Sequence, residues 1–132
     1  RSYEALEEMV AVSESLLEAL RLPYRKLLMC TGDLGFTQAK KYDLEVWSAG
    51  QGRWLEVSSI SNLEAFQANR LRTRARPGGV NGKGRPEPVH TLNGSALAFP
   101  RTIAALVENN QRADGTVEVP DALAGYLGTK TL

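Results

Sequence analysis

The chain begins with apolar residues at helical spacing, which predicts an amphipathic helix over residues 3–20. Its apolar face is made of Leu6, Met9, Val10, Leu17 and Leu20. Pro23 follows this segment, and a proline disfavours helical backbone in the residue before it, so the helix is expected to end there. A buried strand is predicted over residues 25–31, before a Gly-containing turn.

Strict alternation of apolar and polar residues then predicts a half-buried strand over residues 42–47. A Gly-rich turn at residues 49–53 joins it to a second strand, residues 54–60, so the two form a hairpin. Ser61 and Glu64 fit a capping box, which predicts a short helix through Leu71.

Residues 74–88 are rich in Gly and Pro, which is typical of a loop insertion. A strand over residues 89–98 and a helix over residues 100–112 follow, with Pro100 suited to the first helical position because it lacks an N–H. A final short helix is predicted at residues 122–127. This order predicts an α+β fold, an antiparallel β-sheet flanked by helices on one side, and 132 residues suit a single domain, 1–132.

Composition narrows the class of protein without naming a function. A hydrophobic content of 42% supports a packed core, and a net charge of +1 gives no overall attraction to nucleic acid. The single cysteine, Cys30, suits a reducing and therefore cytoplasmic compartment. No apolar run approaches the roughly 20 residues of a membrane span. His90 is the one histidine, which excludes a Cys/His metal cluster, and both Cys30 and His90 are interpreted as packing residues in apolar strands.

Positive charge is concentrated in one segment. Residues 65–86 contain no acidic residue, but contain Arg70, Arg72, Arg74, Arg76, Lys83 and Arg85. Such a segment could contact a phosphate backbone, but it lacks the interleaved aromatic residues of a single-strand binder. A solvated loop is the alternative.

The hairpin brings carboxylates together. If the turn centres near residues 50 and 51, Glu45 lies opposite Glu56, and Asp43 shares the face of Glu45 because side chains alternate along a strand. Like charges repel unless a cation separates them, and Mg²⁺ prefers carboxylate and phosphate oxygens. A solvated outer face is the alternative. Glu56 and Ser59 are an odd number of residues apart, so they can act together only if the strand bends or bulges.

A second group of polar residues surrounds the break at Pro100. Arg101 lies in the first turn of the predicted helix, where an arginine and free N–H groups attract anions. Asn93 and Ser95 on the preceding strand offer small polar groups. Together these residues suit a small zwitterion beside a phosphate, although Arg101 by itself could equally be a surface arginine.

The chain resembles the seryl-tRNA synthetases, which are class II aminoacyl-tRNA synthetases. The segments that carry the resemblance, in order, are LPYR (22–25), CTGDLGF (30–36), AKKYDLEVW (39–47), EVSS (56–59) with SN (61–62), FQ (66–67), HTLNGSALA (90–98) and EN (108–109). Residues 91–112 correspond to motif 3 of that family.

The resemblance implies a ligase that couples serine to ATP with Mg²⁺ and then transfers serine to tRNA(Ser). It implies that Glu56, Val57, Ser58, Ser59 and Arg101 bind ATP. Glu56 and Ser59 would hold the metal, and Arg101 and Glu56 would be the catalytic residues. Ser95, with Asn93, would contact the substrate serine.

The resemblance covers only the C-terminal part of the catalytic core. The family's helical arm, motif 1 and motif 2 have no counterpart in these residues, so we expect half an active site and an inactive isolated chain. The complete enzyme is expected to be a homodimer. The alternative is a synthetase-like module that binds serine or a nucleotide without transfer, or a relative of a carrier-protein ligase.

Overall fold

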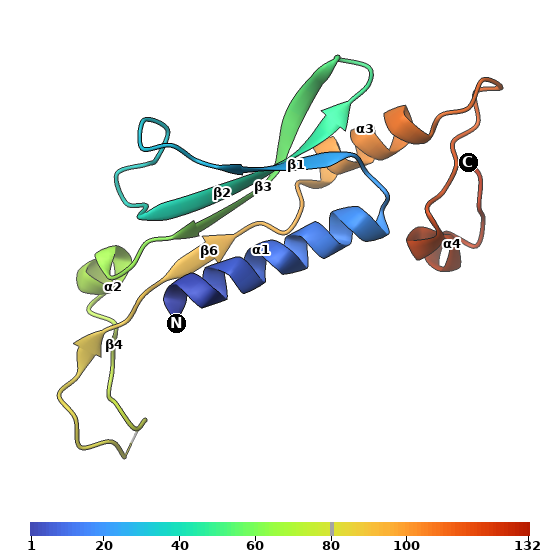
Figure 1. Ribbon diagram of the computed structural model, residues 1–132. Coiled ribbons are helices and arrows are strands. Elements are labelled where there is room, and N and C mark those ends of the chain that lie inside the picture. The colour runs from blue at the N-terminus through green and yellow to red at the C-terminus, as the bar shows by residue number, and fades with distance from the viewer. Residues whose placement is uncertain (80) are drawn as a thin grey trace.

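The computed structural model describes residues 1–79 and 81–132. Along the chain the elements are α1 (Ser2–Ala19), β1 (Tyr24–Leu28), β2 (Lys40–Ser48), β3 (Arg53–Asn62), α2 (Phe66–Leu71), β4 (Arg74–Ala75), β5 (Glu87–Pro88), β6 (Leu92–Gly94), α3 (Phe99–Asn110) and α4 (Asp121–Leu127). Figure 1 shows α1 lying along the sheet. Helix α2 and strand β4 lie toward one end of the molecule, and α3 and α4 lie toward the opposite end.

The main sheet has four strands in the order β1-β2-β3-β6, and each pair is antiparallel. The β2–β3 hairpin forms the centre of this sheet. The alternating pattern of its two segments gives each strand one apolar face. The predicted α+β fold, an antiparallel sheet with flanking helices, is confirmed. Among the described residues no helix combines the length and the apolarity that crossing a bilayer requires.

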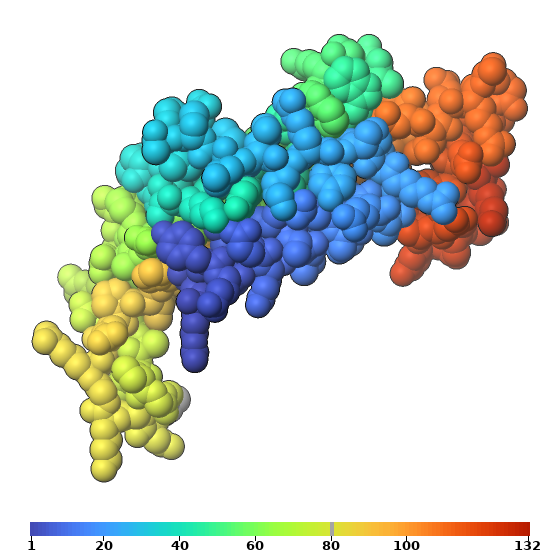
Figure 2. All heavy atoms as spheres, viewed as in Figure 1, coloured from blue at the N-terminus to red at the C-terminus, as the bar shows by residue number. Residues whose placement is uncertain are grey.

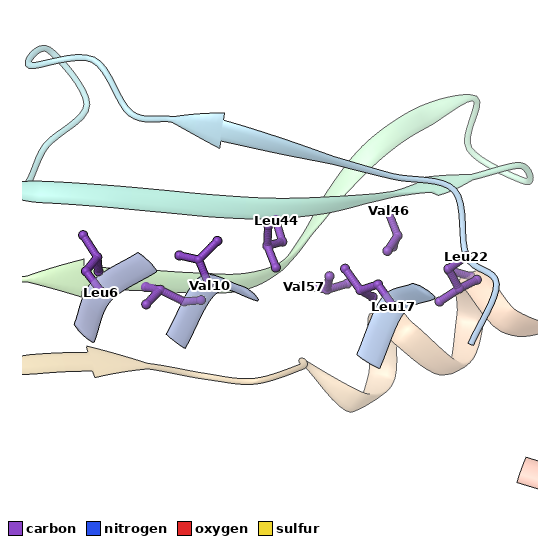
Figure 3. Close-up of a cluster of buried hydrophobic side chains, with 9 residues drawn as sticks. Leu6, Val10, Leu17, Leu22, Leu44, Val46 and Val57 are labelled. Carbon is purple, nitrogen blue, oxygen red and sulfur yellow. The ribbon is translucent and has the colours of Figure 1, made fainter. Parts of the chain in front are cut away.

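The hydrophobic core lies between one face of the sheet and helices α1 and α3. Figure 3 shows Leu44, Val46 and Val57 of the hairpin facing Leu6, Val10 and Leu17 of α1. Ala105 of α3 belongs to the same buried cluster. Burying one leucine side chain contributes about 1.5–3 kcal/mol, so these contacts fix which face of the hairpin is turned inward. The opposite face is left for polar chemistry.

Several predicted boundaries are wrong. The capping box is absent because Ser61 and Asn62 end β3, and the Asn62 side-chain oxygen accepts from the N–H of Glu64 at 2.9 Å. Helix α2 therefore starts only at Phe66, with no side-chain cap. The predicted strand 89–98 is reduced to the three residues of β6.

Cys30 and His90 were expected in the packed interior, and both are exposed. Cys30 follows the end of β1 in the turn before β2, where no helix covers it. The His90 ring Nδ1 lies 2.7 Å from the Ser2 hydroxyl at the start of α1. Neither side chain has the buried environment that the apolar pattern indicated.

The end of α3 holds the turn of the central hairpin. The Glu108 carboxylate accepts from the Ser48 hydroxyl at 2.6 Å and from the Gly50 N–H at 3.1 Å. The Asn109 side chain donates to the Trp47 carbonyl at 2.8 Å. The hydrogen bonds that Glu108 accepts, first the one from Ser48 and then the one from Gly50, lower its pKa below the ordinary value of 4.5. A Cβ on Gly50 would lie 2.9 Å from Oε1 of Glu108, so a larger residue there would displace the carboxylate from this contact.

This contact predicts acid sensitivity. A carboxyl group whose pKa falls on folding stabilises the protein above pH 4.5, and that stabilisation is lost as the pH falls through the lower folded value. We therefore expect Glu108→Gln to lower the midpoint of thermal unfolding at pH 7, with a difference from the unsubstituted chain that shrinks toward pH 3. Circular dichroism melts across this range measure it, with Glu8→Gln on α1 as control. A difference that does not change with pH would contradict the assignment.

Candidate functional site

The polar face of the hairpin is shaped by a β-bulge. Residue pairing runs Asp43 with Ser59 and Leu44 with Ser58, and then shifts so that Glu45 lies opposite Glu56. Val57 is the extra residue, and its side chain enters the core. The predicted pairing of Glu45 with Glu56 is confirmed. The bulge also places Glu56 and Ser59 on the same face despite their odd spacing, because their partners Glu45 and Asp43 share a face.

The three carboxylates of this face have different surroundings. Glu45 forms an ion pair with Arg25 of β1 at 2.5 Å, and Asp43, which is buried, forms one with Lys41 at 3.1 Å. Glu56 is exposed, and within the described part of the chain no cation pairs with its carboxylate. Within those residues no group of three or more acidic, His or Cys side chains is arranged to hold a metal. Glu56 is thus the acid that remains available.

Arg101 projects from the first turn of α3 back to the bulge. Its guanidinium donates to the main-chain carbonyl of Glu56 at 2.6 Å, and the side chain is exposed. The main chain is fixed at the same place, since the Ala98 N–H donates to the Val57 carbonyl at 2.7 Å. The side-chain positive charge of Arg101 is therefore held beside the Glu56 segment, 45 residues earlier in sequence.

Asn93 and Ser95 come from the neighbouring strand segment. Asn93 pairs with Ser61, which shares the polar face of Ser59, and both Asn93 and Ser95 are exposed. The Ser95 carbonyl accepts from the buried Ser58 hydroxyl at 2.5 Å, which ties the segment after β6 to the bulge. Gly94 permits a close approach of the Ile60 side chain, which would lie 3.0 Å from an added Cβ.

Val57 and Ser58 have a different position from the other predicted ATP-binding residues. Both side chains are turned away from the polar face and are 1% and 2% exposed. Any contact of these two residues with a ligand on the polar face would have to come from main-chain atoms. The structure thus brings together Glu56, Ser59 and Arg101, and leaves Val57 and Ser58 as their support.

The sequence analysis did not predict the cluster of one arginine and two tryptophans that lies beside Glu45. The Arg25 guanidinium lies 4.9 Å from the centre of the Trp54 ring, and Trp54 meets Trp47 edge-on with ring centres 5.4 Å apart. A cation–π contact adds about 0.5–1 kcal/mol at exposed sites, and an aromatic pair adds about 0.5–1.5 kcal/mol. Only the pairing of β1 with β2 reveals this group, because Arg25 lies directly across from Glu45.

The available oxygen atoms suit a magnesium ion that arrives with a phosphate ligand. Mg²⁺ is usually bound through one or two carboxylates together with water and substrate phosphates. One carboxylate, from Glu56, and one hydroxyl, from Ser59, fit that manner of binding. An all-protein cage does not fit, since Glu45 is paired with Arg25 and Asp43 is paired with Lys41. The second carboxylate oxygen of Asp43, Oδ1, is buried and has no hydrogen-bond partner among the described residues.

Comparison with known proteins gives matches over most or all of the chain. Residues 1–110 match the family model described as "tRNA synthetase class II core domain (G, H, P, S and T)". Among curated proteins, the serine–tRNA ligase of Salinibacter ruber is 64% identical over 127 residues, which is 96% of this chain and 29% of that protein. The serine–tRNA ligase of Methylobacillus flagellatus is 58% identical over 132 residues, 100% of this chain and 30% of that protein. The chain thus spans under a third of these relatives.

Solved structures give the same result for the fold. The crystal structure of seryl-tRNA synthetase from Pyrococcus horikoshii complexed with ATP superposes with a TM-score of 0.91 at 45% identity, covering 98% of this chain and 28% of that one. The cytoplasmic serine–tRNA ligase of Naegleria fowleri in complex with AMP gives a TM-score of 0.86 at 36% identity, covering 99% of this chain and 30% of that one.

Proposed function

The chain belongs to the class II tRNA synthetase core-domain family, and we propose on that premise that the complete protein activates serine with ATP and transfers it to tRNA. The main observation behind the proposal is that Arg101 donates a hydrogen bond to the Glu56 carbonyl. The segment of Asn93 and Ser95 is bound to the same bulge through the hydrogen bond from Ser58 to the Ser95 carbonyl. The 64% identity to a serine–tRNA ligase supports serine as the amino acid.

In the proposed reaction a carboxylate oxygen of serine attacks the α-phosphorus of ATP, and pyrophosphate leaves. Negative charge shifts toward the leaving phosphates, and a fixed guanidinium is well suited to stabilise it through charge-assisted hydrogen bonds. We assign this role to Arg101, whose position is set before ATP arrives by its hydrogen bond to Glu56. Such a preset donor needs no reorganisation during the reaction.

We assign the magnesium ligands to Glu56 and Ser59. When bound with ATP, Mg²⁺ would neutralise part of the phosphate charge. The protein's own contribution is to keep the Glu56 carboxylate without a competing cation and to hold both side chains on one face through the bulge. Arg25 and Lys41 contribute by pairing with the other two acids, which limits repulsion on this face.

Serine would be held by Ser95 and Asn93. Ser95→Ala is expected to raise the KM for serine by roughly 3–10-fold with little change in kcat, since one neutral hydrogen bond contributes about 0.5–1.5 kcal/mol. Steady-state exchange kinetics with varied serine measure this. Ser15→Ala on the exposed side of α1 is the control. An unchanged KM in the Ser95 variant would remove Ser95 from the serine site.

Serine-dependent exchange of pyrophosphate into ATP tests the function. We would assay the 132-residue chain beside a version extended upstream to the length of its relatives. The proposal predicts exchange and tRNA charging by the extended protein and none by the short chain, because the assigned residues supply only one side of an active site. Exchange without tRNA charging would instead indicate a carrier-protein ligase relative. No exchange with serine in the extended protein would overturn the proposal.

We also propose that the complete protein is a homodimer, as the family resemblance implies. Large apolar side chains are exposed on this chain, including Phe36 at 89% and Phe99 at 76%, and further protein surface would cover them. Light scattering on the extended protein measures its mass. A monomer at assay concentration would refute this part of the proposal.

A further inference from the structure

A cationic arm projects from the body of the molecule between β3 and β6. Its charged residues are Arg70, Arg72, Arg74, Arg76, Lys83 and Arg85, and all six are exposed. Figure 2 shows the arm (yellow) extending away from the sheet and α1. The candidate site accounts for none of these charges.

The cations of the arm are not paired with acids in the part of the chain that the structure describes. Every ion pair found there uses other lysines, arginines or the N-terminus. Residues 65–86 contain no acid, and Glu87 of β5 is the first one after them. Arg70 is partly positioned by an aromatic contact, with its guanidinium 4.7 Å from the centre of the Phe66 ring. The arm therefore presents a concentrated positive field.

The base of the arm is fixed to the sheet. Arg74 pairs with Pro88 and Ala75 with Glu87, so β4 and β5 close the arm as a ladder. Below the ladder, the Thr91 hydroxyl donates to the Gln67 side chain at 2.9 Å. Main-chain hydrogen bonds of 2.9 Å also join Thr91 to Leu63 and to Glu64. The charges thus have a defined direction relative to the site on the sheet.

The surface of the arm is hollowed beside two of its arginines. Arg74, Ala75, Arg76 and Gly79 line an open hollow of 430 Å³. Gly79 has no side chain there and nothing lies within 4 Å of the place a Cβ would take, so a backbone can approach closely. Five of the six cations are arginines, whose planar fork matches phosphate oxygens.

We propose that this arm binds the sugar–phosphate backbone of RNA. The arm has no aromatic residue between positions 70 and 88 to stack on bases, so the contact is electrostatic and insensitive to sequence. An anionic membrane is a poorer fit, because helix α2 at the base of the arm has only six residues and offers no extended amphipathic face. The inference rests on the proposed function only where the RNA is taken to be a tRNA.

The test measures binding of the 132-residue chain to a serine tRNA transcript and to a 20-nucleotide polyuridylate, by fluorescence anisotropy at 50–200 mM salt. If all six cations meet phosphates, affinity falls roughly 10²–10³-fold over this range. The triple variant R72Q/R74Q/R76Q should have about half the slope of log affinity against log salt. The matched control R21Q/R53Q/R112Q removes the same charge elsewhere and should keep the slope. Circular dichroism checks that each variant is folded. If the triple variant is not folded, K83Q/R85Q, which lies in the part of the arm before β5, replaces it.

Steep salt dependence that is reduced only by the arm variants supports the proposal. Equal slopes in the arm and control variants overturn it, as does binding that does not depend on salt. An arm-dependent interaction with anionic vesicles or with polyglutamate, but not with either RNA, also overturns it. Pyrophosphate exchange by the extended protein is measured separately. Normal exchange together with RNA binding that the arm variants do not change would contradict the proposed role of the arm alone. RNA binding that depends on the arm, without any exchange, would contradict the proposed enzyme activity alone.

Discussion

Replacing Arg101 by alanine in the upstream-extended protein is expected to lower the rate of pyrophosphate exchange by roughly 10²–10³-fold, the usual effect of removing one main electrostatic donor, about 2.7–4 kcal/mol. The guanidinium is positioned beside the Glu56 segment before any ligand is bound. Its loss should therefore act on kcat, because the developing phosphate charge loses a donor already in place. Folding should be nearly unchanged, because the side chain is exposed and makes a single hydrogen bond there.

Arg53→Ala is the matched control for this experiment. Arg53 is also exposed and also makes one side-chain hydrogen bond, 2.8 Å to Gln51, but it lies at the far end of the hairpin. Equal rates for the Arg53 and Arg101 variants would show that Arg101 acts only through overall charge. A melting temperature that falls in the Arg101 variant alone would point to a structural role.

Glu56→Gln is expected to have an effect of similar size on exchange, and in addition to raise the Mg²⁺ concentration that gives half-maximal rate. Glutamine keeps the shape of the side chain and one oxygen but removes the charge that a divalent cation prefers. The expected loss of rate is on the order of 10²-fold or more, as for other main electrostatic contacts. Exchange assays over a magnesium titration measure both quantities.

The neighbouring acid provides the comparison for Glu56. Glu45 lies directly opposite on the same face, but Arg25 already pairs with its carboxylate. Glu45→Gln should therefore leave the magnesium dependence close to that of the unsubstituted protein. If both variants shift the magnesium requirement equally, the metal would be shared between the two carboxylates and the assignment to Glu56 and Ser59 would be wrong.

The hairpin could be predicted from the sequence because two independent patterns agreed there. Alternation identified each strand, and the Gly-rich turn fixed the pairing of Glu45 with Glu56. The odd spacing of Glu56 and Ser59 even required the bulge that the structure contains. A strand pattern combined with a turn therefore determines both register and face.

Features that depend on pairing between distant segments could not be predicted. Nothing in the segment around Arg25 indicates that it meets Glu45, since that contact depends on the register of β1 against β2. The capping box failed because β3 extends through Asn62 and uses the same residues for strand pairing. Exposure of Cys30 was missed for a related reason, since an apolar strand pattern does not show where a strand stops.

The extra residue at Val57 limits how this segment could be moved into another protein. In a regular hairpin, residues three apart point to opposite faces, so the same EVSS sequence without its bulge would bury either Glu56 or Ser59. Deleting Val57, by contrast, would leave Glu56 and Ser59 two residues apart and on the same face, but it would remove a side chain from the core. A designer who transplants the segment must therefore carry over the β2 partner strand, because the two strands together encode which side chains reach the ligand.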